Sequence, residues 1–201
     1  MRRNKEAILL VDGLPASSKA NLLVEQIGDE REVFYVSFPD NLHVLTMKSI
    51  NSLLDENVQA ILKTYKQFSI IGISFGGYIV AHDGDLLSRY SEYINRITLY
   101  SPVARLSEVI GIETLPAFLN EKYPSLRADM KDFLNLDKAL SPNKLLSGEL
   151  AGRTRIILGA KDEQLLVDFH RDYFRRFKTD IIEDGHISIS TLMRRGIVEW
   201  M

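Results

Sequence analysis

The segment Gly72-Ile73-Ser74-Phe75-Gly76-Gly77 carries the strongest structural signal in this chain of 201 residues. It matches the pattern G-x-S-x-G and stands where an apolar run at residues 68–73 gives way to a segment of helical character. A serine on a tight, strained turn between a strand and a helix projects its hydroxyl above the sheet, and neighbouring glycines let strand and helix approach. The alternative is a glycine-rich turn in which the serine is incidental. The segment predicts a strand-to-helix junction with Ser74 as a candidate nucleophile.

Short apolar runs alternate with longer helical segments along the rest of the chain, which is typical of βαβ units around a parallel sheet. Runs such as residues 7–11 are continuously apolar, as expected for strands covered on both faces. We expect an α/β fold with a mostly parallel sheet of six strands, at residues 7–11, 33–38, 68–73, 94–100, 155–158 and 179–182. Helices are expected on both faces of the sheet, at residues 17–28, 47–65, 76–93, 164–177 and 190–200.

Residues 101–152 interrupt this alternation with a long segment that four prolines divide into short pieces, such as a helix at 127–136. It is too long for an ordinary connection and too short for a domain, and such excursions are usually lids or binding segments. It contains more apolar residues than a loop requires, among them Phe118 and Leu119. We expect these two side chains to line a substrate pocket within a single domain that spans residues 1–201.

Two further residues follow strands in an order that serine-based catalysis can use. Asp162 follows the fifth expected strand, and His186 follows the sixth. Because the carboxyl ends of parallel strands gather at one edge of a sheet, Ser74, Asp162 and His186 can converge there. A serine hydroxyl is a weak nucleophile that needs a histidine to accept its proton, and that histidine needs a carboxylate to orient it. Glu163 is the alternative to Asp162 as this carboxylate.

These residues and their order make the sequence similar to the α/β-hydrolase superfamily over nearly the whole chain. The resemblance implies a hydrolase fold in which Ser74 is the nucleophile, Asp162 the acid and His186 the base. It also implies a reaction that needs no metal and no organic cofactor. As a small member would, the chain is expected to lack the family's early strands and any large cap.

Backbone N–H groups near Ser74 are candidates for binding an oxyanion. The N–H of Phe75 stands at the start of a helix, and the resemblance implies a second donor in the loop after the first strand, for which we expect Leu14. The family often has His-Gly in this loop, where the present chain has Asp12-Gly13. A carboxylate beside an oxyanion would oppose it, so we expect Asp12 to turn away and accept backbone N–H groups. Asp12 is then a structural turn residue or a contact for a cationic or hydroxylated substrate in the pocket.

The other histidines carry no comparable pattern. His43, His82 and His170 have no second ligand at metal spacing, and we interpret them as surface or structural residues. We therefore expect no metal site.

Composition narrows the partners and the cellular location. The chain has 25 Lys and Arg residues against 27 Asp and Glu, a formal net charge of -2 that offers no general attraction to nucleic acid or anionic membranes. No apolar run approaches the ~18 residues that span a bilayer. The absence of cysteine excludes disulfides and thiolate sites and suits a reducing cytoplasm. We expect a cytoplasmic protein whose partner is a small molecule.

The function that these features favour is hydrolysis of a small carboxylic ester or thioester through an acyl-enzyme. The sequence leaves two alternatives open. The same fold can serve as a ligand-binding receptor or scaffold without turnover, because fold does not fix function. The same three side chains can also support carbon-carbon bond hydrolysis or a lyase reaction.

Overall fold

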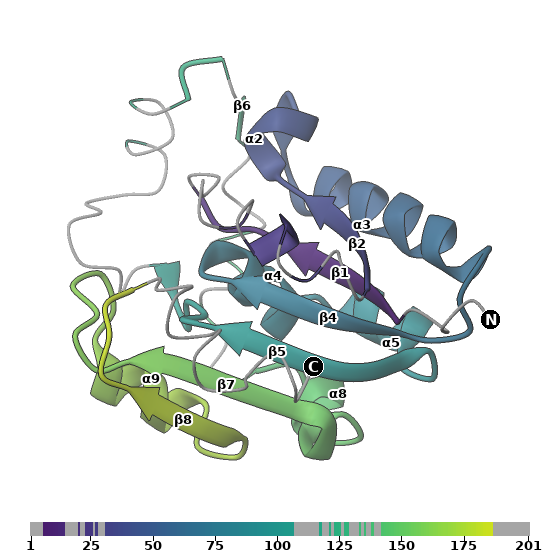
Figure 1. Ribbon diagram of the computed structural model, residues 1–201. Helices are drawn as coiled ribbons and strands as arrows, with labels where there is room; N and C mark the ends of the chain where they lie inside the picture. Colours follow the sequence, from purple (N-terminus) through teal and green to yellow (C-terminus); the bar gives the residue numbers. More distant parts are fainter. Residues whose placement is uncertain are drawn as a thin grey trace.

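The computed structural model describes residues 6–14, 20, 23–25, 27, 31–106, 117, 121, 123–125, 127, 128, 133, 135, 138 and 142–186. Six of the described strands form one sheet in the order β2-β1-β4-β5-β7-β8, and all neighbours are parallel (Figure 1). They are β1 (Ala7–Val11), β2 (Glu32–Val36), β4 (Phe68–Ile73), β5 (Ile94–Tyr100), β7 (Thr154–Gly159) and β8 (Lys178–Ile182). The six-stranded parallel sheet expected from the sequence is confirmed.

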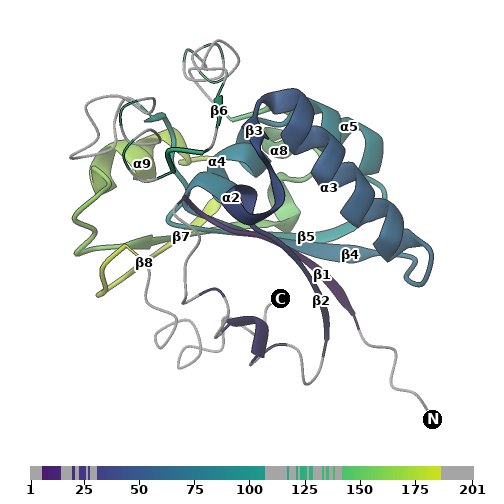
Figure 2. The same cartoon turned by 90° about the horizontal axis from the view of Figure 1, so that it is seen from above.

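The central strands β1 and β4 are buried along their whole length, which explains their continuous apolar sequences. One face of the sheet packs in an apolar cluster with residues of α3 (Met47–Leu62), α4 (Phe75–His82), α5 (Gly84–Tyr90) and α9 (Val167–Tyr173). Figure 2 shows these four helices together on one side of the sheet. The opposite face forms a second cluster with Ala20, Leu23 and Ile27.

The sequence of α3 explains where the helix begins and which face it buries. Thr46 caps its first turn, because the Thr46 hydroxyl accepts the Ser49 N–H at 3.0 Å and the Ser49 hydroxyl accepts the Thr46 N–H at 2.9 Å. The buried side chains fall on one helical face, at Ile50, Leu54, Val58 and Ile61. The helix predicted at 47–65 is therefore present, with its end at Leu62.

Two predicted elements end earlier in the structure than expected, one because of a capping carboxylate and the other because of a proline. The single helix expected at 76–93 is wrong, since Asp83 divides it: its carboxylate accepts the N–H groups of Asp85 and Leu86 and caps α5 as a separate helix. The strand expected at 33–38 ends at Val36. Pro39 has no N–H for a strand ladder, and the chain turns instead into α2 (Phe38–Asn41).

The helix expected at 164–177 is also shorter than predicted. The Asp162 carboxylate accepts the N–H groups of Gln164 and Leu165, both at 2.9 Å, and holds these residues in a turn. The helix α9 therefore begins only at Val167 and ends at Tyr173.

The excursion at 101–152 contacts the segment of the chain between β2 and β4. Its residues Arg127–Ala128 form β6, which pairs in parallel with β3 (Val44–Leu45), so the helix expected at 127–136 is wrong at its start. The excursion returns to the sheet through α8 (Lys144–Ser147), and the 3-10 turn η2 (Ala151–Arg153) leads into β7. The expected helix 190–200 lies outside the described residues, as does most of the one at 17–28.

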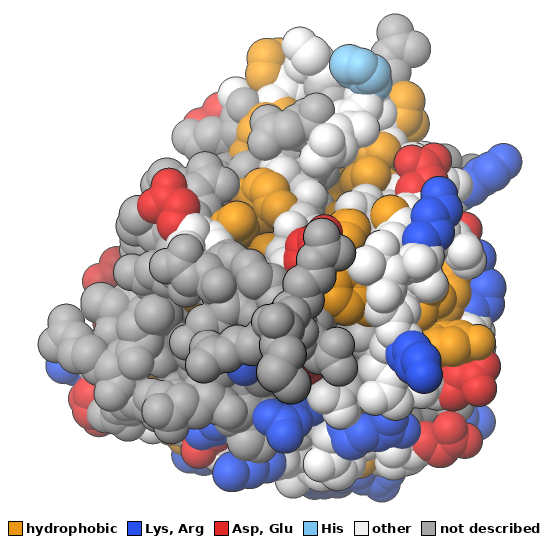
Figure 3. Space-filling model, turned by 45° about the vertical axis from the view of Figure 1, so that its right-hand side comes forward, with side chains coloured by type: hydrophobic (Ala, Val, Ile, Leu, Met, Phe, Trp, Pro, Cys, Tyr) orange, Lys and Arg blue, Asp and Glu red, His pale blue; other side chains and the backbone are white. Residues whose placement is uncertain are grey.

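Charged side chains of both signs are interspersed on the face shown in Figure 3. This mixture agrees with the small formal net charge of the sequence. Across the part of the chain that the structure describes, no helix is both long and apolar enough to cross a membrane.

Candidate active site

Ser74 lies at the junction of β4 and α4, and its backbone has a conformation that residues other than glycine rarely adopt. Its φ is 50° and its ψ is -113°, and Ser101 is the one other non-glycine residue with positive φ among those described. Strain of this kind costs about 1–3 kcal/mol and persists where the surroundings fix it. The Ser74 N–H donates to Tyr100 O at 2.9 Å, and Ser74 O accepts the N–H of Tyr78 at 3.0 Å. These bonds tie the turn to β5 and to α4.

The glycines beside Ser74 are required by close packing. A Cβ on Gly76 would lie 2.2 Å from Val11 O, and a Cβ on Gly72 would lie 2.8 Å from the Cα of Gly77. Neither contact is possible for a real side chain, so α4 can start against the ends of β1 and β4 only with glycine at these positions. The serine hydroxyl is thereby held at the carboxyl edge of the sheet.

The loops after β7 and β8 are joined to each other, and this brings Asp162 to His186. A Cβ on Gly159 would lie 2.2 Å from Gly185 O, so the two loops are in direct contact. Two backbone hydrogen bonds also link them, from Ala160 N–H to Ile182 O at 2.7 Å and from Lys161 N–H to Asp184 O at 2.8 Å.

Ser74, His186 and Asp162 form a continuous hydrogen-bonded chain. His186 Nε2 lies 2.9 Å from Ser74 Oγ, and His186 Nδ1 lies 2.7 Å from Asp162 Oδ2. With a proton on Nδ1, the neutral ring donates to Asp162 and accepts the serine hydroxyl proton at Nε2. The structure thus brings together the three side chains that the sequence singled out, although 112 positions separate Ser74 from His186.

The environment of Asp162 favours its ionised form. Burial by itself would raise its pKa, but the hydrogen bond and charge of His186 and the N–H groups of Gln164 and Leu165 together hold the pKa of Asp162 below its usual value. The Asp162 side chain is 1% exposed. A buried, ionised carboxylate can therefore orient His186 through Nδ1.

The start of α4 and the loop after β1 both lie next to Ser74. Phe75 is the first residue of α4, so its N–H has no acceptor within the helix. The loop after β1 passes close to the serine, because a Cβ on Gly13 would lie 3.2 Å from Ser74 Cβ and 3.7 Å from Ser74 Oγ. The next residue in that loop is Leu14, whose N–H the sequence predicts as a second oxyanion donor.

Neither a family model nor a curated protein matches the chain, whereas solved structures do. A monoacylglycerol lipase from Paleococcus ferrophilus is 16% identical, with a TM-score of 0.63 over 96% of this chain and 93% of that chain. The carboxylesterase CesB from Bacillus subtilis is 12% identical, with a TM-score of 0.62 over 98% of this chain and 84% of that chain. A 2-hydroxy-6-oxo-6-phenylhexa-2,4-dienoate hydrolase from a Rhodococcus strain is 14% identical, with a TM-score of 0.62 over 98% and 90%.

The match to these three structures covers 96–98% of this chain. The chain has the α/β-hydrolase fold. In an α/β-hydrolase fold built on a parallel sheet, the carboxyl ends of the strands are the edge where functional groups collect. Ser74, Asp162 and His186 all follow strands at that edge.

Within this α/β-hydrolase fold, Asp12 accepts a backbone N–H, as expected. The residue is completely buried, and its Oδ1 accepts the N–H of Gly13 at 2.7 Å. Its Oδ2 accepts the hydroxyl of Tyr35 at 2.5 Å. Sequence reasoning missed Tyr35, because nothing in the pattern of β2 distinguishes a packed tyrosine from one that bonds a carboxylate.

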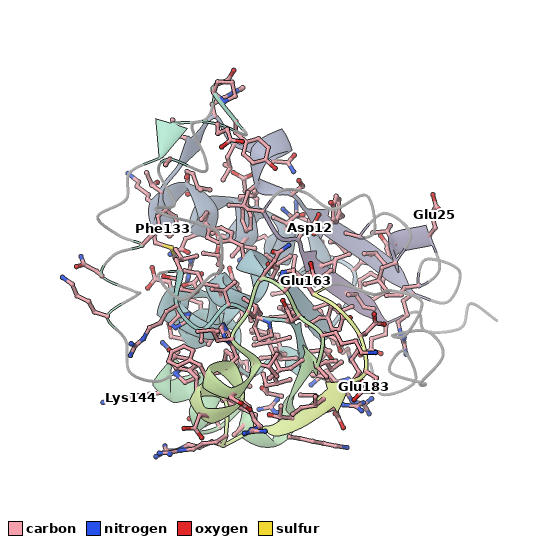
Figure 4. The ribbon with its side chains drawn as sticks, turned by 90° about the vertical axis from the view of Figure 1, so that its left-hand side faces the viewer. Asp12, Glu25, Phe133, Lys144, Glu163 and Glu183 are labelled. Carbon is pink, nitrogen blue, oxygen red and sulfur yellow. The ribbon has the colours of Figure 1, made fainter. Side chains whose placement is uncertain are left out.

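Figure 4 looks onto the carboxyl edge of the sheet, with Asp12 near its centre and Phe133 to one side. Glu163 is exposed, and the carboxylate that bonds His186 belongs to Asp162. Phe118 and Leu119, expected to line the pocket, lie outside the described residues. Phe133 is a further residue that the sequence did not single out: it is completely buried and its ring centroid lies 5.9 Å from that of Phe75.

The remaining histidines lie apart from this chain of hydrogen bonds. His43 is exposed, while His82 and His170 are buried, with Nδ1 of each near a helix carbonyl, at 2.7 Å from Tyr78 O and 2.9 Å from Leu166 O. Where the structure describes the chain, it holds no group of three side chains able to bind a metal ion.

Proposed function

We propose that the protein is a serine hydrolase that cleaves a small carboxylic ester or thioester through an acyl-enzyme. The observation that carries this proposal is the hydrogen-bonded chain from Ser74 Oγ through His186 to Asp162. A base within 2.9 Å of a serine on a strained strand-to-helix turn is the arrangement that activates a hydroxyl. A turn with an incidental serine would have no need of it.

In the proposed reaction, His186 Nε2 accepts the Ser74 proton while Oγ attacks the substrate carbonyl carbon. The N–H groups of Phe75 and Leu14 stabilise the oxyanion that forms. His186 then gives its proton to the leaving group, and the acyl group stays on Ser74. A water activated by His186 releases the acid, and Asp162 remains ionised throughout to stabilise the imidazolium. These steps require neither a metal nor an organic cofactor.

We place the acyl pocket beneath the excursion at 101–152. Two described parts of it support this: Val103 N–H donates to Ser74 O at 3.3 Å, and Phe133 packs against the ring of Phe75, the residue after the proposed nucleophile. Phe118 and Leu119 are proposed to complete its apolar wall. The cysteine-free composition suits a reducing compartment, and we propose a cytoplasmic location for the activity.

Labelling with a fluorophosphonate probe tests the proposal directly, because such probes react with activated serines. Wild type should be labelled, Ser74→Ala should not, and Ser101→Ala should be labelled like wild type. Ser101 is the matched control, since it also has positive φ and is buried. Turnover should then be measured with p-nitrophenyl esters of rising chain length and with short acyl thioesters.

The alternatives give different results in the same assay. A wild type that is not labelled and turns over no ester or thioester would favour a ligand-binding receptor or scaffold. Labelling of Ser74 without any ester or thioester turnover would favour a carbon-carbon hydrolase or a lyase.

A further inference from the structure

The buried carboxylate of Asp12 and the half-buried phenol of Tyr35 form a hydrogen-bonded pair near the proposed nucleophile. Both carboxylate oxygens of Asp12 are engaged, one by the N–H of Gly13 and the other by the Tyr35 hydroxyl. The two donors come from different directions, one from the loop itself and one from the neighbouring strand. An aspartate that only filled a turn would need the first of them but not the second.

The pair connects the loop after β1 to the outer strand of the sheet. Leu10 pairs with Tyr35 in the register of β1 and β2, and Asp12 N–H continues this pairing to Val36 O at 3.0 Å. The backbone of Asp12 and its side chain are thus both held by β2. The same loop borders Ser74 through Gly13 on its other side.

This arrangement determines which N–H group of the loop can face an oxyanion. The N–H of Gly13 is committed to Asp12 Oδ1, so the following N–H, of Leu14, is the one left to the reacting centre. The bond from Gly13 N–H to Asp12 Oδ1 fixes the Asp12-Gly13 peptide. Because Gly13 has no side chain to restrict its own dihedral angles, the Gly13-Leu14 peptide that follows takes its starting direction from this fixed one.

We propose that Asp12 and Tyr35 are positioning residues that orient the Gly13-Leu14 peptide for oxyanion binding at Ser74. The inference rests on the proposed hydrolase function and deepens it. The hydrogen bond from Tyr35 also favours oxyanion binding through charge. A carboxylate close to an oxyanion opposes it, and two hydrogen-bond donors on Asp12 reduce the negative charge that it presents to Ser74.

The test compares Asp12→Ala, Asp12→Asn and Tyr35→Phe with wild type in steady-state hydrolysis of a p-nitrophenyl ester. Tyr65→Phe is the matched control, because the Tyr65 hydroxyl donates to Glu32 at 2.5 Å in a second carboxylate-phenol pair, at the opposite end of β2. Asp12→Ala should lower kcat on the order of 10²-fold and Tyr35→Phe about tenfold, since removing one oxyanion donor costs 10²- to 10³-fold in known enzymes. KM should change by less than about twofold, because the lost interaction acts in the transition state.

Asp12→Asn should recover much of the activity lost in Asp12→Ala, because its amide oxygen can still accept the Gly13 N–H. A residue needed only for folding would lower the melting temperature without this split between kcat and KM. The amide proton resonance of Gly13 gives a readout independent of turnover: it should move upfield in Asp12→Ala and stay in place in Tyr65→Phe.

The outcomes separate failure of this inference from failure of the proposed function. If the wild type is labelled at Ser74 by the fluorophosphonate probe but Tyr35→Phe keeps the wild-type kcat, the inference is wrong and the hydrolase proposal stands. A rise in KM at constant kcat would likewise overturn it, in favour of a substrate contact. If the wild type is neither labelled nor active, both fall together. Should Asp12→Ala fail to fold, Tyr35→Phe decides, since it removes a single hydroxyl.

Discussion

Ser74 and Ser101 occupy equivalent places on neighbouring strands, but they differ in what surrounds their hydroxyls. Each directly follows its strand, β4 or β5, and each has positive φ, 50° and 41°. The bond from Ser74 N–H to Tyr100 O sets the two serines side by side. Ser74 Oγ lies 2.9 Å from His186, whereas the Ser101 hydroxyl is buried without a hydrogen-bond partner in the described part of the chain.

Backbone strain and a hydroxyl with a neighbouring base are therefore separate properties. Positive φ at both serines marks the edge where the chain must leave the sheet abruptly. After Ser74 the chain enters a helix, and the loops after β7 and β8 bring a base to the hydroxyl. After Ser101 it meets Pro102 and departs into the excursion. What distinguishes the candidate nucleophile is its partner, not its strain.

The largest expected effect is on activity and separates the two serines completely. Ser74→Ala, His186→Ala and the double variant should each lose on the order of 10⁴-fold or more in kcat, without additivity, because the two groups act as one unit. Ser101→Ala should stay within about threefold of wild type, since its hydroxyl meets no reacting group. The measurement is kcat for all four variants on one ester. Equal losses at both serines would show that the hydroxyl of Ser74 has no special role.

A smaller loss is expected when the partner of His186 changes. Asp162→Asn should lower kcat on the order of 10³-fold, because the ring loses its orienting charge but keeps a neighbour of similar shape. Glu163→Gln is the control and should behave as wild type, because Glu163 is exposed. A damaging Glu163→Gln beside a mild Asp162→Asn would reassign the acid.

Stability should respond alike at the two serines, in contrast to activity. At each position the glycine variant should be more stable than the alanine variant by about 1 kcal/mol, because glycine adopts positive φ without the strain that alanine retains. Denaturant unfolding of Ser74→Gly, Ser74→Ala, Ser101→Gly and Ser101→Ala measures this difference. A preference for alanine at either site would show that the turn there is not strained.

The smallest expected effect is on the pH dependence of stability, through the Asp162 carboxylate that bonds His186 next to Ser74. Since the pKa of Asp162 is held below its ordinary value of 3.8, its ionised form stabilises the folded state above that pH, and the contribution is lost as the pH falls through the lowered pKa. The free energy of unfolding of wild type should therefore exceed that of Asp162→Asn by more at about pH 5 than at about pH 3. A gap that widens on acidification would contradict the direction of the shift.

The strands and the three hydrogen-bonded side chains could be predicted from the sequence for a physical reason. Burial on both faces dictates continuous apolar runs such as Ala7–Val11, and residues that follow parallel strands must meet at one edge of the sheet. Ser74 directly follows β4, and Asp162 and His186 lie in the loops that follow β7 and β8, so the order of strands and polar residues along the sequence was enough to predict that they meet.

Features that depend on one polar group, or on the pairing of segments far apart in the sequence, could not be predicted. The break at Asp83 depends on one carboxylate that caps a new helix instead of being an exposed helix residue. The pairing of Arg127–Ala128 with Val44–Leu45 joins two-residue strands that carry no periodicity. Tyr35 contributes through its hydroxyl, which donates to Asp12. The residue pattern of a strand predicts which face of the sheet a side chain lies on, but not which atom its hydroxyl bonds.

The strand order also governs when, during folding, the site can exist. Every neighbouring pair in the sheet is parallel, so no pair forms as a local hairpin, and each requires a crossover and closure of a long loop. His186 follows β8, an outer strand that pairs with β7, while Ser74 follows the interior strand β4. A chain that has assembled β1, β4 and β5 already has its serine turn but no base. The hydrogen-bonded chain is therefore complete only after the last described strand has joined the sheet.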